Sequence, residues 1–254
     1  MTHVRLRLLW HPQPQFAGYH LAQHDGFAAA REVELDCLPL DFSVGPIAAV
    51  LDGAADFAVA SPAHMLESRA PQDLVMLLAI QQASSLVYGA RRSAGITDAR
   101  DLAGKRIAVW PGGEDLELRW LLHRAGVPAG AATLVPVADT VAALASGETD
   151  AAQMTTYHEV FELEAAVPSL DAFALLAAAD RDAALLKDGL FARRDFVAAH
   201  PALTQRVIDA VLEGWTLAFA DPEVALARTL AGAPADFVDP SFWEAAPPAF
   251  RRRP

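Results

Sequence analysis

The sequence predicts an α/β fold built as two lobes. Short apolar runs typical of strands alternate with helical patterns along almost all of the 254 residues, which indicates strands that run parallel. Two successive series of this kind are followed by a mostly helical C-terminal segment. We place lobe I at residues 1–90 plus 188–254 and lobe II at residues 91–187, with the chain crossing near residues 88–92 and 185–189.

Lobe I is expected to alternate strands and helices from its first residues. Two helices begin where proline follows glycine or serine, at Gly45-Pro46 and Ser61-Pro62, because proline suits the first helical position and serine can cap it. The expected strands are residues 4–9, 33–40, 56–60, 74–80 and 85–90, and the expected helices are residues 16–30, residues 47–51 and the segment after Ser61.

Lobe II repeats the alternation after residue 93, and the chain then returns to lobe I. Pro201 again stands at the first position of a long helix. The strands expected in lobe II are residues 106–110, 132–137, 150–154 and 172–176, and its helices are residues 98–103, 116–125, 140–145 and 157–166. The returning segment is expected to be extended at residues 189–193 and helical at residues 201–219 and 222–231.

Composition excludes several classes of protein. With 20 Lys+Arg against 32 Asp+Glu, the net charge is −12, and nucleic-acid binding would need a basic face. One cysteine excludes an internal disulfide framework and a thiolate zinc cluster. No apolar run approaches the roughly 20 residues of a membrane span. The chain enters its first strand without the pattern of an export leader, which predicts a cytoplasmic protein as written, or a periplasmic one if a leader has been removed.

The loops that follow the strands should hold the functional site. In a two-lobed α/β protein, ligands bind in the crevice at the carboxyl ends of the strands. These loops combine aromatic rings, amides, hydroxyls and carboxylates, which suit a planar, hydrogen-bonding ligand. We expect ligand contacts from Trp10, Gln15, Phe16, Ser61, Gln82, Ser84, Gly112, Gly113, Glu114, Tyr157, His158 and Glu159.

Several of these residues also have a simpler interpretation. Trp10 and Phe16 are equally suited to packing in the core, and Gly112-Gly113 suits a plain turn. Glu159 at the start of a helix can be a solvated carboxylate that is stabilised by the helix dipole. The loops contain no arginine to clamp a phosphate or sulfonate, although free helix N-termini can bind an anion without one.

The order of several motifs resembles one known family. The segment Trp10-His11-Pro12-Gln13-Pro14-Gln15-Phe16-Ala17-Gly18-Tyr19 is followed by Gly53-Ala54-Ala55-Asp56-Phe57-Ala58-Val59 and then by Asp101-Leu102-Ala103-Gly104-Lys105-Arg106. This order resembles the thiamine-pyrimidine-precursor and alkanesulfonate (SsuA-type) substrate-binding proteins of ABC transporters. The resemblance is good over residues 8–126, looser over residues 154–164 and weak beyond residue 200.

The resemblance implies a hinged periplasmic-binding-protein fold, a small-molecule ligand and an ABC permease as partner, with no cofactor and no metal. The opening motif is closer to the pyrimidine and flavin binders than to the sulfonate and taurine binders. One departure is His158-Glu159-Val160, which stands where the family commonly has Asn-Glu-Pro, so the acid is kept while its neighbours differ. By position, the residues that would face the ligand are Trp10, Ser61, Gln82, Ser84, Gly113, Tyr157 and Glu159.

Enzymes of the same fold are the alternative interpretation. A pyrimidine synthase that uses pyridoxal phosphate needs a pocket lysine, and Lys105 and Lys187, the two lysines, fall at a strand start and near a crossing. A cysteine-dependent desulfinase would need an exposed thiol, whereas Cys37 lies in the middle of a predicted strand. His20 and His24 are spaced to share a metal but lack an evident third ligand. A lyase similar to those of the menaquinone pathway also remains open.

Overall fold

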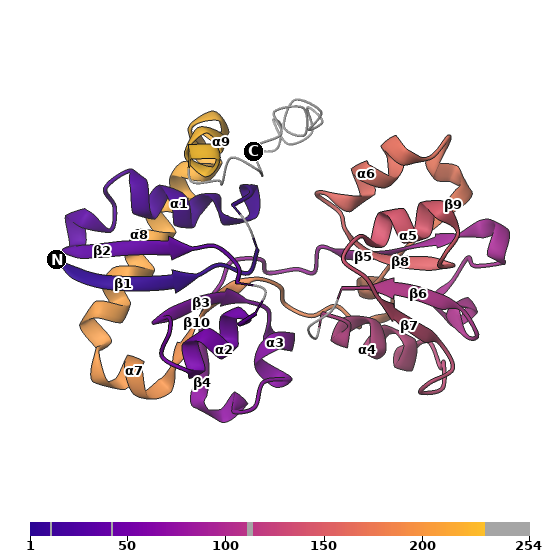
Figure 1. The fold of residues 1–254 in the computed structure, drawn as a ribbon, viewed down its shortest axis with the longest axis horizontal. Coiled ribbons are helices and arrows are strands. Elements are labelled where there is room, and N and C mark those ends of the chain that lie inside the picture. The colour runs from indigo at the N-terminus through magenta and orange to yellow at the C-terminus, as the bar shows by residue number, and fades with distance from the viewer. Residues whose placement is uncertain (11, 42, 111–113, 232–254) are drawn as a thin grey trace. The chain divides into compact units, whose positions relative to one another are not determined.

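The chain forms two compact α/β units, each described here by itself (Figure 1). The computed structural model describes residues 1–10, 12–41, 43–110 and 114–231. Unit 1 comprises residues 1–60 and 70–78 and the segment that begins at Leu190, and unit 2 comprises residues 61–69 and 79–189. Two crossings are expected, near residues 88–92 and 185–189, whereas the chain passes between the units after residues 60, 69, 78 and 189. The long segment of unit 2 thus begins at residue 79, before the first expected crossing. The expected position lies inside strand β5 (Leu86–Arg91), which pairs with two strands of unit 2.

Unit 1 is organised around a five-stranded sheet with the order β2-β1-β3-β10-β4. Strand β1 (Thr2–Arg7) pairs in parallel with both β2 (Val33–Leu38) and β3 (Phe57–Ala60), as the sequence predicts. All four residues of β3 are buried. The remaining strands are β10 (Gly189–Arg193) and β4 (Leu74–Ala79).

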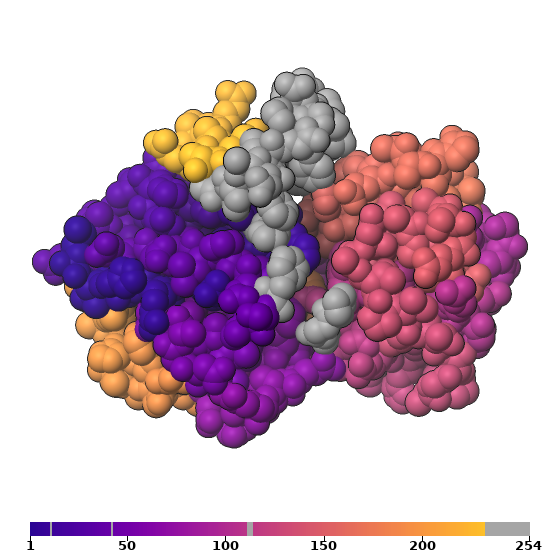
Figure 2. Space-filling view, in the orientation of Figure 1, coloured from indigo at the N-terminus to yellow at the C-terminus, as the bar shows by residue number. Residues whose placement is uncertain are grey.

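The helices of unit 1 include one close crossing. Helix α1 (Ala17–His24) packs against α8 (Pro201–Ala220), and α9 (Pro222–Ala231) packs on both and lies at the surface of the unit, in yellow in Figure 2. Shorter helices are α2 (Pro46–Leu51) and α7 (Arg194–Ala199). The helix expected at residues 16–30 is shorter because Gly26 adopts a φ of +84°, which no continuing helix tolerates.

Unit 2 contains a second five-stranded sheet, with the order β7-β6-β8-β5-β9. Strand β6 (Arg106–Val109) runs parallel to β7 (Thr133–Pro136) and β8 (Ala151–Thr155). Strand β5, in contrast, is antiparallel to both β8 and β9 (Phe173–Ala177). The expectation of parallel strands is therefore wrong for this side of the sheet, because the apolar run of β5 carries no information about the direction of its neighbours.

Alternating side chains of the second sheet supply two separate cores. Ile107 packs on one face with Leu118 of helix α4 (Leu116–Arg124). Ala108 faces the other side, with Leu144 of α5 (Thr140–Ser146) and Leu163 of α6 (Glu159–Ala166). A sheet that is buried on both faces leaves its strand ends and the adjoining helix starts as the places for polar chemistry.

The contact between α1 and α8 predicts a large cost for one added methyl group. A Cβ atom on Gly214 would lie 2.1 Å from the carbonyl oxygen of Gly18 and 2.9 Å from the amide nitrogen of Ala22, both backbone atoms that cannot rotate away. We expect Gly214→Ala to lower the free energy of unfolding by about 1–3 kcal/mol, measured by urea denaturation. Gly45→Ala is the control, because its Cβ would meet nothing within 4 Å. Equal stability of the two variants would contradict the close crossing.

A buried histidine on α1 predicts acid sensitivity. His20 is 2% exposed, neither ring nitrogen has a hydrogen-bond partner among the described residues, and burial, followed by repulsion from His24, lowers its pKa to about 4. The unfolded chain takes up this proton near pH 6.5 and the folded chain only near pH 4, so stability falls as the pH drops between these values. We expect a loss of about 2 kcal/mol between pH 8 and pH 5.

The matched variants for this prediction are His20→Leu and His24→Gln. The first removes the buried imidazole and should flatten the pH dependence of the unfolding free energy. The second removes only the exposed neighbour on the same helix and should leave most of that dependence in place. An unchanged pH dependence in His20→Leu would assign the effect to other groups.

Candidate functional site

A chain of polar contacts in unit 2 begins at the start of helix α3 (Pro62–Leu66). Ser61 is 1% exposed and is the N-cap of α3, with proline next in the chain, as the sequence predicts. Its Oγ lies 2.8 Å from Nδ1 of His64, one turn into the helix. The other ring nitrogen of His64, Nε2, lies 3.1 Å from Oε1 of Glu114. The N-cap is thereby connected, through His64, to a carboxylate that is distant in the sequence.

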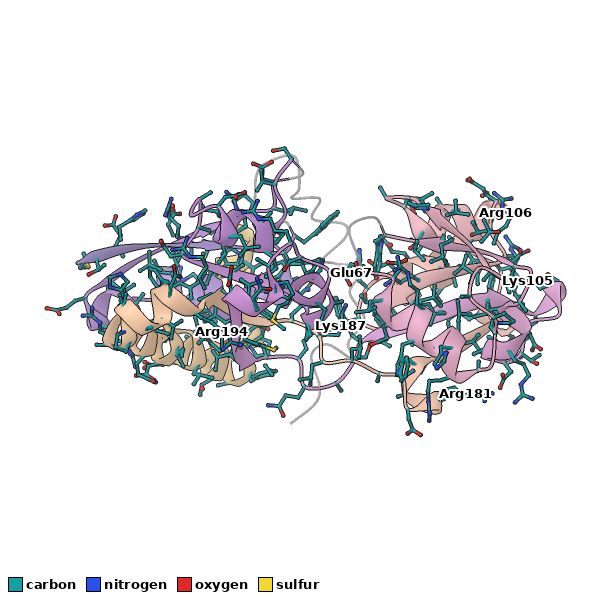
Figure 3. All side chains as sticks on the ribbon, turned by 90° about the horizontal axis from the view of Figure 1, so that it is seen from below. Glu67, Lys105, Arg106, Arg181, Lys187 and Arg194 are labelled. Atoms are coloured by element: carbon teal, nitrogen blue, oxygen red, sulfur yellow. The ribbon has the colours of Figure 1, made fainter. Side chains whose placement is uncertain are left out.

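Glu114 also forms a buried ion pair. Its Oε2 accepts a hydrogen bond of 2.8 Å from Nζ of Lys187, which is labelled in Figure 3, and the two side chains are 13% and 9% exposed. Burial raises the pKa of Glu114, but Lys187 and His64 outweigh it, so the pKa lies below its usual value. Burial likewise lowers the pKa of Lys187, but Glu114 and Asp188 outweigh it and the pKa lies above its usual value. Both members of the pair are therefore charged.

A second carboxylate lies on the first turn of α4. Glu117 is 2% exposed; its Oε1 accepts a hydrogen bond from the Ser84 hydroxyl and its Oε2 accepts one from the Leu185 amide, both of 2.8 Å. Burial raises the pKa of Glu117 in spite of these hydrogen bonds. We refer to His64, Glu114, Glu117, Lys187 and Asp188 as the Glu114 cluster.

Tyr157 lies near this cluster. Burial, together with the charges of Asp188 and Glu159, raises the pKa of Tyr157 well above its usual value, so the side chain is a neutral phenol. Asp188 is held by its backbone: its carbonyl oxygen accepts hydrogen bonds from the amides of Ile80 and Gln81, at 3.0 and 2.9 Å. A neutral phenol among carboxylates can both donate and accept hydrogen bonds.

Glu159 is oriented from the end of strand β8. Its Oε2 accepts hydrogen bonds from the amide and the hydroxyl of Thr155, at 2.8 and 2.5 Å. Its Oε1 lies 4.0 Å from Nε2 of His158, the N-cap residue of α6. The side chains of His158 and Glu159 are 26% and 17% exposed, so both are accessible to a ligand.

Gln153 is a fully buried amide in the middle of β8. Its Nε2 donates a hydrogen bond of 2.8 Å to the carbonyl oxygen of Glu114, and its Oε1 accepts one of 3.4 Å from the amide of Trp110. The side chain thus connects the end of strand β6 to the cluster. Gly112 and Gly113, predicted from the sequence as ligand contacts, lie outside the described residues.

Four of the predicted site residues belong to the Glu114 cluster or interact with its members: Ser61, Ser84, Glu114 and Tyr157. Glu159 acts on Tyr157. His158 adjoins Glu159, and Gln82 is an exposed residue of unit 2.

Three of the predicted site residues, Trp10, Gln15 and Phe16, belong to unit 1. Trp10 is 41% exposed, whereas Phe16 is completely buried. Gln15 accepts a short hydrogen bond of 2.5 Å from the amide of Gln13, which orients its side chain. Their contacts with a ligand stay predictions.

Sequence reasoning missed the partners that organise the cluster. His64, Glu117 and Lys187 were not among the predicted residues, although Lys187 is one of two lysines, lies next to an aspartate and falls near an expected crossing. Those features together could have indicated it. Nothing in the local pattern of His64 or Glu117 distinguishes either from a solvated helical residue.

The buried pair predicts a large loss of stability when its cation is removed. Lys187→Met leaves the carboxylate of Glu114 buried without its main counter-charge, and we expect a loss of about 3 kcal/mol in the free energy of unfolding, measured in urea. Adding Glu114→Gln to that variant should recover part of the loss, because no uncompensated charge then remains.

The other lysine is the control for this prediction. Lys105 donates a hydrogen bond of 2.7 Å to the carbonyl oxygen of Ala94, and Lys105→Met should cost only about 1 kcal/mol. A Lys187→Met variant no less stable than Lys105→Met would show that the ion pair contributes nothing beyond one ordinary hydrogen bond.

In the part of the chain that the structure describes, no helix is both long and apolar enough to cross a bilayer. No curated protein sequence matches the chain significantly.

Solved structures of similar fold include sulfonate-binding proteins. The chain is similar to the periplasmic aliphatic sulphonate binding protein SsuA of Escherichia coli, with 20% identity and a TM-score of 0.70 over 98% of this chain and 84% of that one. It is also similar to the alkanesulfonate-binding protein SsuA of Xanthomonas axonopodis pv. citri bound to MOPS, with 19% identity and a TM-score of 0.65 over 98% of this chain and 85% of that one.

A third solved structure, of a DszB mutant in complex with biphenyl-2-sulfinic acid, shares 18% identity and a TM-score of 0.54 over 91% of this chain and 80% of that one. At these identities the similarity shows the fold, which is that of the periplasmic binding proteins. A family model described as NMT1/THI5 like matches residues 13–225, most of the chain. The chain therefore belongs to the NMT1/THI5-like family.

Proposed function

We propose that this protein is a solute-binding protein that captures a planar, nitrogen-containing heteroaromatic compound, such as a thiamine-precursor pyrimidine or a flavin-like molecule, for an ABC-type permease. Membership of the NMT1/THI5-like family and the fold shared with solute-binding proteins support the general function. The observation that supports the ligand class is the excess of carboxylates around the Glu114 cluster.

The charges of the cluster favour a ligand that donates hydrogen bonds. Three carboxylates, those of Glu114, Glu117 and Asp188, lie around Lys187. A fourth, that of Glu159, acts together with Asp188 on Tyr157. Burial raises the pKa of Glu117, and the charge of Glu114 raises it further. Ring amines and protonated ring nitrogens donate hydrogen bonds to carboxylates, and an aromatic ring can pack on Tyr157.

A sulfonate would meet a less favourable charge distribution. Sulfonates bind best to arginine or to several free amide donors. Arg119, near the start of α4, already pairs with Asp115 at 2.7 Å and with Glu67 at 3.5 Å, and Lys187 is paired with Glu114. We therefore favour the heteroaromatic ligand over the sulfonates bound by the structurally similar proteins.

The environment of Cys37 does not suit a nucleophilic cysteine. Burial, and then the charge of Asp36, raises the pKa of this thiol far above its usual value, and its sulfur donates a hydrogen bond of 3.6 Å to the carbonyl oxygen of Tyr19. A nucleophilic cysteine requires the opposite, a lowered pKa beside a basic group. Binding without reaction is accordingly the simpler function for this chain.

A thermal-shift panel tests the ligand class. Aminopyrimidines and riboflavin are compared with taurine and MOPS at equal concentrations. A heteroaromatic ligand present at 100 times its Kd should stabilise the folded protein by about 2.7 kcal/mol and raise the Tm. Stabilisation by the sulfonates alone would contradict the proposed ligand class. Mass spectrometry of the recovered ligand distinguishes binding from catalysis, since a chemically altered ligand would identify an enzyme.

Two tryptophans of equal exposure offer a matched comparison for the same ligand. Trp10 is 41% exposed and Trp120, which is outside the predicted site, is 43% exposed. By analogy with stacking on nucleobases, Trp10→Ala should weaken binding by about 1–3 kcal/mol, whereas Trp120→Ala should leave the Kd unchanged, both measured by isothermal titration calorimetry. Equal affinity of both variants would remove Trp10 from the site.

A further inference from the structure

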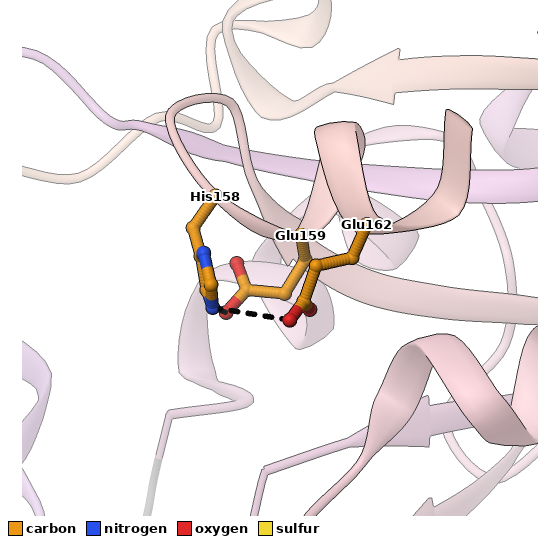
Figure 4. Close-up of side chains that lie close together, drawn as sticks. All are labelled: His158, Glu159 and Glu162. Atoms are coloured by element: carbon orange, nitrogen blue, oxygen red, sulfur yellow. Dashed lines mark ion pairs between the residues drawn. The ribbon is translucent and has the colours of Figure 1, made fainter. Parts of the chain in front are cut away.

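A compact group of potential metal ligands lies at the start of helix α6. It consists of His158, Glu159 and Glu162, whose ligand atoms all lie within 4.8 Å of one another (Figure 4). Among the residues that the structure describes, this is the one place where three potential metal-ligand side chains come this close together. It combines one imidazole with two carboxylates and is referred to below as the His158 group.

The helix geometry explains why these side chains converge. His158 and Glu162 are separated by four residues, so they lie on the same face of α6, and side chains on a helix lean toward its N-terminus. The carboxylate of Glu162 is thereby directed back to the imidazole, and Oε1 lies 3.4 Å from Nε2 of His158. Glu159 approaches the same nitrogen from the first helical position, with its Oε1 at 4.0 Å.

These separations are close to those of a metal site. Zinc–nitrogen and zinc–oxygen bonds are about 2.0–2.2 Å long, so two ligands at a tetrahedral angle lie about 3.4 Å apart. The distance from His158 to Glu162 already has this value, and the distance from His158 to Glu159 exceeds it by about 0.6 Å. Small side-chain rotations would complete the arrangement and leave a fourth position for water or another donor.

One potential metal ligand, Glu159, is already held in place by hydrogen bonds from Thr155. Both hydrogen bonds from Thr155 are made to Oε2 of Glu159, which leaves Oε1 directed to the His158 group. Metal-binding carboxylates are typically oriented by such a hydrogen bond to the oxygen that does not bind the metal. The side chain of Glu159 therefore does not need to be ordered when a cation arrives.

The surrounding charges also favour a cation. Burial raises the pKa of Glu162, and the negative charges of Glu159 and Asp139 raise it further, while His158 lowers it. The cost of placing these carboxylates together would be relieved by a bound divalent ion. Imidazole as the third donor favours zinc and similar transition metals over magnesium and calcium, which prefer oxygen ligands throughout.

We propose that His158, Glu159 and Glu162 form a binding site for one divalent transition-metal ion, with zinc as the representative ion. The site shares His158 and Glu159 with the residues expected to contact the solute, but it does not rest on the proposed function. The ordinary alternative is an ion pair between protonated His158 and Glu162, which needs no metal.

Calorimetric titration of the protein with zinc chloride, after removal of bound metal with EDTA and of any affinity tag, tests the site. We expect one equivalent of zinc to bind, and magnesium and calcium to bind at least about 10-fold more weakly. Glu162→Gln and His158→Gln should each weaken zinc binding by at least about 10-fold, and Thr155→Val by about 10-fold. Glu164→Gln, an exposed glutamate on the same helix, should leave the affinity unchanged.

Three results would overturn the proposal: no zinc binding at 100-fold excess, unchanged zinc affinity in both Glu162→Gln and His158→Gln, or preferential binding of magnesium or calcium. Zinc binding that is lost only in His24→Gln would assign the ion to the pair His20 and His24. The solute panel repeated in EDTA separates this inference from the proposed function, because solute binding without metal would leave the function intact if the zinc site fails.

Discussion

The ion pair between Glu114 and Lys187 is the interaction on which unit 2 depends, because it joins segments that are distant in sequence. Lys187 lies just before the chain leaves the unit at Gly189, and His64, the other partner of Glu114, lies in the separate segment 61–69. The carbonyl oxygen of Asp188 holds the start of the segment 79–189, because it accepts hydrogen bonds from the amides of Ile80 and Gln81. Every segment by which the chain enters or leaves unit 2 is thus tied to one buried set of polar contacts. A buried pair of this kind is costly to desolvate and stabilises only when its geometry is complete, which here it is on both carboxylate oxygens.

The same contacts are the basis of the proposed ligand class. The charge of Lys187 is balanced by that of Glu114. The carboxylates of Glu117, Asp188 and Glu159 therefore make the surroundings acidic. Glu117 and Asp188 are buried, so the carboxylate of this set that keeps some exposure is that of Glu159, and it acts on the neutral phenol of Tyr157. Family membership and fold leave several ligand classes open, and this charge distribution is the property of the chain on which the proposed ligand class rests.

The fold could be predicted from the sequence because its determinants are local. Alternation of strands and helices, and proline at the helix starts of α2, α3 and α8, depend on residues that are close together along the chain. The direction of β5 could not be predicted in that way, since its apolar run reads the same in a parallel or antiparallel neighbourhood. For the candidate site, Ser61, Glu114 and Glu159 could be proposed from the sequence because they follow strands or begin helices. His64 and Lys187 were missed because their importance arises only from the carboxylate between them.

The strand order of the first sheet has a consequence for the time at which each unit is completed during translation. Strand β10 lies between β3 and β4, yet it is synthesised more than 100 residues after either of them. The ribosome has therefore released all of residues 61–69 and 79–189 before the strand that closes the first sheet emerges. Although unit 1 contains the N-terminus, unit 2 is the first to have its complete sequence available. The nascent chain must keep β3 and β4 apart, with their inner edges unpaired, while the inserted unit folds.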